Sequence, residues 1–395
     1  MNKFRSILRS FFLFFSKNVI SPFFRKSYII FESDPDFCDS TFKVYKYFCD
    51  NNKFNKYRPI WVVYDKENAM DDCKCINYPN PFLSSESKCK YWYYKLILYY
   101  YTLRSIAIIC NNRQFTKVSK RQYSFYVAHG APVKSVKGVY ESPEDLDYFF
   151  IQGRWLEKIT REDDNINDHT ITVPLGLPRN DDLLSNNGLD RNEIFGRYNK
   201  VVVWYPAFRK HKFSDTRGAK FSHDIPIIYD FNNAQELNNC AKSHNVLLVI
   251  KPHFSQDVSR IKDWHLSNLK FIDNTFFIDN HINSYQMLSL TDALLTDFSS
   301  IYYDYMLLDR PIGLVLEDMN EYVKYMGVVV SLEKELNGGE RIYNVRDLCD
   351  FVSRIAVGQD KRKVERKACN NLINNYQDAL STQRVSNYIC NILRI

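Results

Sequence analysis

The hydrophobic residues of this chain gather in short, nearly continuous runs that are separated by longer polar or amphipathic stretches. Five runs in the first half have the length of buried strands: 28–31, 59–63, 105–109, 125–128 and 148–151. Apolar runs without alternation are typical of a parallel sheet that is covered on both faces. The second half repeats the scheme with the runs 201–204, 246–250, 293–295 and 312–316. The pattern therefore predicts two doubly wound α/β halves.

A chain of 395 residues exceeds the size at which one hydrophobic core keeps growing, so two domains are the natural expectation. The best candidate for their boundary is Asn186-Asn187-Gly188, a turn signal before a polar helix. We predict an N-terminal segment at 1–26, a first domain at 27–188, a second at 189–359, and C-terminal helices at 360–395. Whether these last helices cross back onto the first domain is left open. Ligands of such sheets bind at the carboxyl ends of the strands, which predicts a cleft between the halves.

The basic residues of the chain are concentrated at its N-terminus. Residues 1–26 carry six basic residues and no acidic one, so they hold nearly all of the formal net charge of +7. A nucleic-acid-binding protein would be expected to carry a basic face on its folded body. We therefore expect no nucleic-acid partner.

The same segment has the pattern of an amphipathic helix. Its apolar residues follow the spacing of one helix face: Phe4, Ile7, Leu8, Phe11, Phe12, Phe15 and Val19. The uninterrupted run 11–15 is too short to span a bilayer, which needs ~20 residues, and the cleavage site of a signal peptide is missing. A basic, aromatic-rich helix suits the surface of an anionic membrane, and packing on the protein body is the alternative. The aromatic stretch 91–101 is a second candidate anchor, but we expect it to form a buried helix.

The ten cysteines are scattered along the chain. Cys73, Cys75 and Cys89 lack the paired spacing of a zinc site, and no histidine lies near them in the sequence. We predict free thiols in a reducing cytosol.

A turn of small hydroxyl residues, Thr296-Asp297-Phe298-Ser299-Ser300, connects the predicted strand 293–295 to an amphipathic run at 301–308. Such a turn at the start of a helix directs backbone N–H groups and hydroxyls at one spot, which suits a phosphate. Serine and aspartate also serve as ordinary helix N-caps. The turn alone does not separate these two interpretations.

A histidine follows the predicted strand 125–128, in the sequence His129-Gly130-Ala131-Pro132-Val133-Lys134. Its near-neutral pKa would let it accept a proton from a hydroxyl group. A turn histidine with a structural role is the alternative.

Three further motifs follow predicted strands and carry charged side chains. The rigid loop 174–181 contains Arg179 and Asp181, which could pair with each other or position a substrate. Arg209 follows the first strand of the second half and offers a guanidinium, the best donor for phosphate oxygens. Lys251-Pro252-His253 adds an ammonium and a second histidine at the next strand end.

Together these residues resemble the CDP-glycerol glycerophosphotransferase family, the teichoic acid primases and polymerases of bacterial envelopes. The resemblance covers roughly residues 28–345 and rests on five motifs: His129-Gly130-x-Pro132-x-Lys134, Gly176-x-Pro178-Arg179-x-Asp181, Pro206-x-Phe208-Arg209, Lys251-Pro252-His253, and Thr296-Asp297-Phe298-Ser299-Ser300 with Asp304 and Pro311 after it. The chain departs from the family pattern at Ala131, Ala207 and Met326, where residues with hydrogen-bonding side chains are usual.

The resemblance implies an α/β fold of the GT-B class, with two Rossmann-like domains facing a cleft, and peripheral binding to the membrane. It also implies a nucleotide-activated polyol phosphate as donor and a lipid-linked hydroxyl as acceptor. We expect an enzyme that transfers glycerol phosphate from CDP-glycerol to a lipid-linked or glycan acceptor and releases CMP. Its place would be teichoic acid or capsule synthesis, at the cytoplasmic face of the bacterial membrane.

In this hypothesis His129 and His253 are catalytic, and His129 takes the proton from the acceptor hydroxyl. The donor phosphates are bound by six residues: Arg209, Lys251, Thr296, Asp297, Ser299 and Ser300. Six more residues support the site: Gly130, Pro132, Lys134, Arg179, Asp181 and Asp304. Preorganised donors of this kind are usually the largest contribution to catalysis.

We expect no cofactor and no metal ion in this reaction. Three alternatives stay open. The donor could be CDP-ribitol, the protein could be a GT-B glycosyltransferase that uses a nucleotide sugar, or it could be an inactive, membrane-associated assembly protein.

Overall fold

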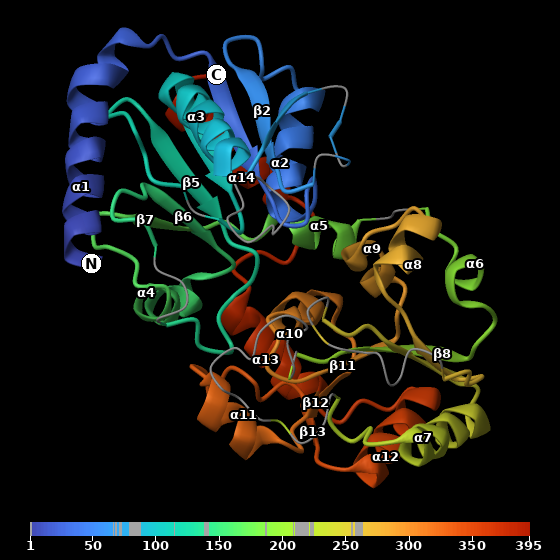
Figure 1. Ribbon diagram of the computed structural model, residues 1–395. Helices are drawn as coiled ribbons and strands as arrows, with labels where there is room; N and C mark the ends of the chain where they lie inside the picture. The colour runs from blue at the N-terminus through green and yellow to red at the C-terminus, as the bar shows by residue number, and fades with distance from the viewer. Residues whose placement is uncertain are drawn as a thin grey trace. The chain divides into compact units, whose positions relative to one another are not determined.

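The computed structural model describes residues 2–65, 67, 69–70, 73–78, 88–113, 115–137, 142–185, 188–207, 209, 221, 225–253, 256 and 264–395. The chain divides into two compact α/β units (Figure 1). Unit 1 spans Met1–His129, Lys137–Arg179 and Leu380–Ile395, and unit 2 spans Gly130–Val136 and Asn180–Ala379. Three residues of the sequence motifs, Asn186, Asn187 and Phe208, lie outside the described residues.

Unit 1 is built on a seven-stranded parallel sheet in the order β3-β2-β1-β4-β5-β6-β7. Its strands are β1 (Tyr28–Glu32), β2 (Arg58–Val63), β3 (Lys74–Asn77), β4 (Ser105–Cys110), β5 (Tyr123–Val127), β6 (Tyr148–Ile151) and β7 (Ile171–Pro174). Its α-helices are α1 (Asn2–Phe15), α2 (Asp39–Asp50), α3 (Lys88–Arg104), α4 (Glu157–Asp163) and α14 (Ser381–Leu393). The strand order reverses between β1 and β4.

Unit 2 is built on a six-stranded parallel sheet in the order β10-β9-β8-β11-β12-β13. Its strands are β8 (Lys200–Tyr205), β9 (Val246–Ile250), β10 (Leu269–Phe271), β11 (Ala293–Thr296), β12 (Ile312–Val315) and β13 (Glu340–Ile342). Its α-helices are α5 (Asp181–Leu184), α6 (Arg191–Phe195), α7 (Phe231–Ser243), α8 (Asn274–Asp279), α9 (Ser284–Ser289), α10 (Ile301–Tyr305), α11 (Met319–Met326), α12 (Val345–Ala356) and α13 (Lys363–Ile373). Here the order reverses between β8 and β11.

All of the predicted apolar runs overlap strands of these two sheets, so the prediction of two doubly wound α/β halves is confirmed. The apolar runs did not reveal the short strands β3, β10 and β13. Each lies at an edge of its sheet, and each contains charged or polar residues that interrupt the apolar pattern.

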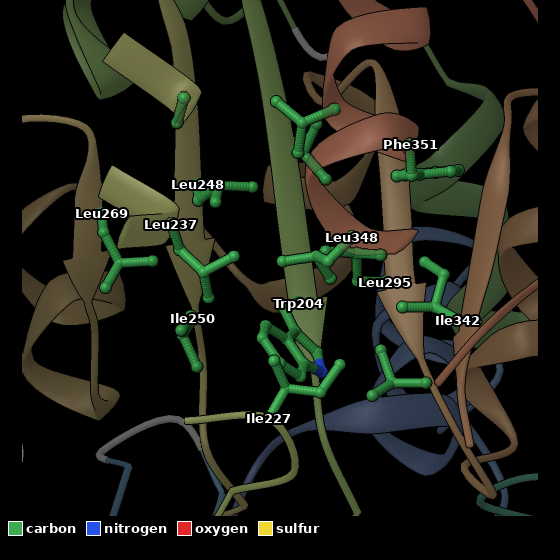
Figure 2. Packing of buried hydrophobic residues seen from close by; sticks show 14 of the residues in the cluster. Trp204, Ile227, Leu237, Leu248, Ile250, Leu269, Leu295, Ile342, Leu348 and Phe351 are labelled. Carbon is green, nitrogen blue, oxygen red and sulfur yellow. The ribbon is translucent and has the colours of Figure 1, made fainter. Parts of the chain in front are cut away.

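The core of unit 2 shows why its central strands read as continuous apolar runs (Figure 2). Leu237 of α7 and Leu348 of α12 pack over Trp204 and Leu295 on one face of the sheet. Side chains of the two neighbouring strands fill the space beside β12, where the chain has a glycine: a Cβ on Gly313 would lie 2.7 Å from side-chain atoms of Ile342 on β13 and Leu295 on β11.

The end of the chain is divided between the two units. Helix α13 belongs to unit 2, whereas α14 packs beside α2 and adds Val385, Ile389 and Leu393 to the core of unit 1. The predicted C-terminal segment 360–395 is therefore two parts with different surroundings. The chain changes unit at Arg179–Asn180, which is earlier than the boundary that the turn signal at 186–188 suggested.

Candidate active site

The residues predicted to bind the donor phosphates, together with His253, lie at or just after the ends of three adjacent strands of unit 2: β9, β8 and β11. In a doubly wound sheet the carboxyl edge at the point of strand reversal is the usual place for a ligand. The motifs after β8 and β11 lie on the two sides of that reversal. Hydrogen bonds connect the loops at this edge, since Thr296 Oγ1 donates to the carbonyl of Tyr205 over 2.9 Å and Lys251 N donates to that of Trp204 over 2.9 Å.

The first half of the serine turn is buried and is used to hold the turn itself. Thr296 and Asp297 are both fully buried. The Asp297 carboxylate accepts the N–H of Ala207 over 2.9 Å, the N–H of Phe298 over 2.7 Å, and a bond from the Arg209 guanidinium. Asp297 therefore ties the turn after β11 to the loop after β8, across the reversal point.

Arg209 completes this buried network. Its Nε and Nη2 donate to the two carboxylate oxygens of Asp318 over 2.8 Å each, and its guanidinium lies 4.8 Å from the ring centroid of Tyr322. Burial alone would lower the pKa of Arg209, but the carboxylates of Asp297 and Asp318 more than offset it and raise the pKa. Burial raises the pKa of Asp297, and Arg209 opposes that rise.

These contacts assign Arg209, Thr296 and Asp297 a structural role, which differs from the direct phosphate contacts that the sequence suggested. The guanidinium charge is matched by two carboxylates, and its side chain is fully buried. Their part in donor binding stays a prediction.

The second half of the turn is more accessible. Ser299 and Ser300 are half-buried and precede α10. Ser300 occupies the N-cap position but makes no side-chain capping bond, and Ser299 Oγ lies 3.5 Å from the N–H of Ile301. Ser299 Oγ thus accepts a long bond from the first turn of α10, and an ordinary capping role does not account for the Ser300 hydroxyl.

Lys251 and His253 follow β9 and are both half-buried. The Lys251 ammonium lies 6.0 Å from the ring centroids of Tyr205 and Phe277, and burial lowers its pKa while Asp273 opposes that effect. The carbonyl of His253 accepts the N–H of Gln256, whose Oε1 accepts the N–H of Arg209 over 2.7 Å.

Gln256 was not predicted as a site residue. It lies three residues after the motif Lys251-Pro252-His253, but its role depends on Arg209, which is remote in sequence.

In unit 1, His129 is exposed and follows β5 at the carboxyl edge. Its Nδ1 lies 2.9 Å from the Asn111 carbonyl oxygen and 2.9 Å from the hydroxyl of Tyr126. Its own carbonyl accepts a bond from Arg179, which pairs with Asp39 over 3.1 Å. Arg179 thus holds the His129 backbone and forms an ion pair with Asp39.

The loop after β4, which carries Asn111, is held by Glu32 at the end of β1. The buried carboxylate of Glu32 accepts the N–H groups of Asn112 and Arg113 over 3.3 and 3.1 Å, and the hydroxyl of Tyr64 over 2.7 Å. Burial raises the pKa of Glu32 from its ordinary value of 4.5 to about 7, although the hydrogen bonds oppose the rise. Glu32 directly follows the predicted apolar run 28–31, and no role was predicted for it from the sequence.

The remaining predicted residues lie in unit 2. Asp304 is fully buried and accepts bonds from Tyr285 Oη over 2.7 Å and Asn180 Nδ2 over 3.0 Å. Asp181 is buried in the first turn of α5. Lys134 forms an antiparallel bridge with Val328.

The loop Gly130–Val136, which contains Pro132, is paired with the segment after Met326. Ser135 N donates to the Gly327 carbonyl over 3.1 Å, and Val329 N donates to that of Val133 over 3.0 Å. Gly130 and Pro132 therefore belong to a loop that is fixed by backbone pairing within unit 2. Among the described residues, no group of three or more histidine, cysteine or acidic side chains is arranged to hold a metal ion.

Residues 13–391 match the model of the family described as CDP-Glycerol:Poly(glycerophosphate) glycerophosphotransferase. This chain belongs to that family. The teichoic acid poly(glycerol phosphate) polymerase of Bacillus subtilis (strain 168) is 23% identical over 326 residues, which are 75% of this chain and 39% of that protein. The teichoic acid ribitol-phosphate primase of Bacillus spizizenii is 22% identical over 152 residues, 38% of this chain and 36% of that protein. This chain therefore spans well under half of the length of the Bacillus subtilis polymerase.

The fold is that of the family's solved structures. The wall teichoic acid polymerase TagF superposes with a TM-score of 0.68 at 18% identity, covering 95% of this chain and 90% of that chain. A second structure of TagF is of a crystal soaked with CDPG. This chain therefore has the α/β fold of the GT-B class that the family resemblance implied.

The surface of unit 1 exposes two sets of apolar residues, on α1 and α3. On α1, Ile7 and Phe11 are 65% and 68% exposed, and on α3, Trp92 and Leu96 are 61% and 65% exposed. The two helices touch through Phe12 and Tyr99, whose ring centroids are 5.2 Å apart. The expectation that the stretch 91–101 forms a buried helix is therefore wrong for its outer face. Within the described part of the chain, no helix combines the length and apolarity needed to cross a membrane.

Proposed function

We propose that this protein transfers glycerol phosphate from CDP-glycerol to a hydroxyl group of a membrane-lipid-linked or glycan acceptor and releases CMP. The observation that carries the proposal is the family match over residues 13–391. The product would be a teichoic acid or a capsular polysaccharide of a bacterial cell envelope.

The transfer step needs one bond to form and one to break. The acceptor oxygen attacks the phosphorus that carries the glycerol, and the bond from that phosphorus to the CMP oxygen breaks. The hydroxyl proton passes to His129, and CMP departs with the negative charge that the broken bond leaves. Because little covalent chemistry falls to the protein, positioning and electrostatic stabilisation dominate such reactions.

On the donor side, we assign the diphosphate to the accessible part of the carboxyl edge of unit 2. Ser299 and Ser300 offer hydroxyl groups, and Lys251 and His253 offer positive charge at the adjacent strand end. The buried pair Asp297–Arg209 supports this assignment because it fixes the turn before any donor binds. Rigid support of this kind lowers the cost of reorganisation during the reaction.

On the acceptor side, we assign the general base to His129. Its exposure supports this role, since a base must reach the hydroxyl from which it takes the proton. The backbone bond from Arg179 to the His129 carbonyl limits the motion of the residue without using its ring.

We also propose that unit 1 binds an anionic membrane surface peripherally, on the cytoplasmic side, through α1 and α3. The exposed aromatic and aliphatic residues of both helices support this, together with the cluster of basic residues at 1–26. Apolar burial combined with attraction to anionic headgroups is the usual basis of such binding.

A vesicle assay tests the membrane contact. Replacing Phe11 and Trp92 by aspartate should strongly reduce cosedimentation with vesicles that contain phosphatidylglycerol, while the far-ultraviolet circular dichroism stays unchanged. The matched control is Val364→Asp, on α13 of unit 2, where the native side chain is 80% exposed. Equal binding by the Phe11/Trp92 variant and the wild type would contradict the proposed surface.

The donor is tested by a turnover screen. The purified protein is incubated with CDP-glycerol, CDP-ribitol or a set of nucleotide sugars, each with a lipid-linked acceptor, and nucleotide release is measured. We expect release of CMP from CDP-glycerol that depends on the acceptor. Consumption of a nucleotide sugar alone would identify a glycosyltransferase, and no turnover of any donor would favour the assembly protein.

A further inference from the structure

The contacts of His129 Nδ1 determine where the ring holds its proton. Two oxygens lie near this nitrogen, the Asn111 carbonyl oxygen and the Tyr126 hydroxyl, each at 2.9 Å. A carbonyl oxygen can only accept a hydrogen bond. Nδ1 must therefore carry a proton for the contact with Asn111 to be favourable, and in the neutral ring the lone pair then belongs to Nε2.

Tyr126 contributes a second oxygen to the same proton. When Nδ1 is protonated, its N–H forms a bifurcated hydrogen bond to the Asn111 carbonyl oxygen and the Tyr126 hydroxyl oxygen. The Tyr126 hydroxyl then directs its own proton away from Nδ1. When the ring takes a further proton at Nε2, both oxygens face a cationic imidazolium. Hydrogen bonds to a charged group are stronger than bonds to a neutral one, so this arrangement favours the protonated ring.

We propose that Tyr126 is a positioning residue for His129, and that together with the Asn111 carbonyl it holds the ring as the Nδ1–H tautomer and stabilises the imidazolium. The inference rests on the proposed function only in taking His129 as the base of the transfer. Nε2 then accepts the proton of the acceptor hydroxyl, and the positive charge that results is balanced by two oxygens at Nδ1.

The two oxygens are themselves held in place. Tyr126 is 3% exposed on β5, and its ring packs on Phe149 with centroids 4.7 Å apart. The loop with Asn111 is held by Glu32 through the N–H groups of the next two residues, Asn112 and Arg113. A base whose orienting groups are fixed needs little rearrangement when it takes a proton.

The charged side chains of Arg179 and Glu32 contact the backbone of His129 and of the loop that carries Asn111. Arg179 donates to the His129 carbonyl and is paired with Asp39, and Glu32 acts through the loop after β4. None of these contacts is changed when the hydroxyl of Tyr126 is removed. The variant Tyr126→Phe therefore isolates the oxygen at Nδ1 and keeps the aromatic packing.

The direct test is nitrogen-15 NMR of the full chain with labelled histidine, in which the His129 signals are assigned by their loss in His129→Ala. In the wild type at high pH we expect the Nδ1–H tautomer, and in Tyr126→Phe a titration midpoint lower by about one pH unit. A wild-type ring with its proton on Nε2, or an unchanged midpoint in the variant, would overturn the inference.

Activity gives a second readout. In Tyr126→Phe, kcat should fall about tenfold at neutral pH, the KM for the donor should change little, and the acidic limb of the pH profile should move to lower pH. Tyr148→Phe removes a hydroxyl from the neighbouring strand β6 and should leave all three unchanged. The NMR experiment needs no substrate. An inactive wild type with the Nδ1–H tautomer would therefore contradict the proposed function and leave the ring assignment standing.

Discussion

Two buried carboxylates occupy matching places in the two units and differ in the charge of their partners. Glu32 ends β1 and holds the loop after β4, whereas Asp297 follows β11 and holds the loop after β8. Each carboxylate therefore bridges the point at which the strand order of its sheet reverses. The donors to Glu32 are a hydroxyl and two backbone N–H groups, while Asp297 also accepts from the guanidinium of Arg209.

The charge of these partners determines whether the stability of each loop depends on pH or on an ion pair. A buried carboxylate with neutral donors favours its protonated form, which is why the pKa of Glu32 is raised to about 7. A carboxylate beside a buried guanidinium stabilises the fold in its charged form, because a buried charge without its partner is costly. We therefore expect the acceptor-side loop of unit 1 to depend on pH, and the donor-side turn of unit 2 to depend on its ion pair.

The largest effect should come from breaking that ion pair. Arg209→Met leaves the buried Asp297 and the half-buried Asp318 without their cation, which should lower the free energy of unfolding by about 3–5 kcal/mol. The control is Arg341→Met, because Arg341 pairs with a Glu333 side chain that is 75% exposed, and it should cost about 1 kcal/mol or less. Urea unfolding measures both. Equal losses in the two variants would mean that the buried network does not hold the turn.

The next effect concerns Glu32 and its dependence on pH. The folded-state pKa of about 7 lies above the ordinary value of 4.5, so the folded state holds this proton more tightly. Stability from this group is complete below pH 4.5 and is lost as pH rises through 7. The loss amounts to about 3 kcal/mol.

Glu32→Gln keeps a neutral group in that place and should be more stable than the wild type at pH 8 but not at pH 4.5. Urea unfolding across this range measures the difference. Glu333→Gln, on an exposed side chain, should follow the wild-type pH dependence. A Glu32→Gln variant that does the same would show that Glu32 does not titrate as described.

A smaller effect is expected at Lys251, where the donor phosphates are proposed to bind. Because burial lowers the pKa of Lys251, its ammonium loses its proton at a lower pH than an ordinary lysine. The KM for CDP-glycerol should therefore rise as the pH is raised into the alkaline range. Lys251→Met should raise the KM about tenfold at neutral pH and remove most of that rise.

The control for this experiment is Lys270→Met, on the edge strand β10, which should behave as the wild type. Steady-state CMP release over a pH series provides the measurement. A Lys251→Met variant with the KM and pH dependence of the wild type would remove Lys251 from the donor site.

The sequence allowed the fold to be predicted because buried parallel strands such as 201–204 and 246–250 are apolar throughout. It also allowed the loops of the candidate site to be found, since polar motifs follow those strands. It could not separate the residues that hold a loop from those that face a ligand. Arg209 has the chemistry of a phosphate ligand, but its partner Asp318 lies beyond β12 and carries no motif.

Other features depend on contacts that no local pattern records. In the sequence Glu32 is a single acidic residue after an apolar run. Its role in holding the loop after β4 depends on a hydrogen bond from Arg113, which is remote in sequence. The exposure of Trp92 on α3 could not be read from an aromatic-rich stretch, because aromatic residues are as suitable for a core as for a membrane surface.

The measurement that tests the account most directly is acceptor-dependent release of CMP from CDP-glycerol by the wild type and by His129→Ala, with His169→Ala as an exposed control in the same unit. The account predicts release by the wild type and by the control, and a rate lower by about 10²–10⁴-fold in His129→Ala. Full activity in His129→Ala would contradict the assignment of the base, and no release by the wild type would contradict the proposed reaction.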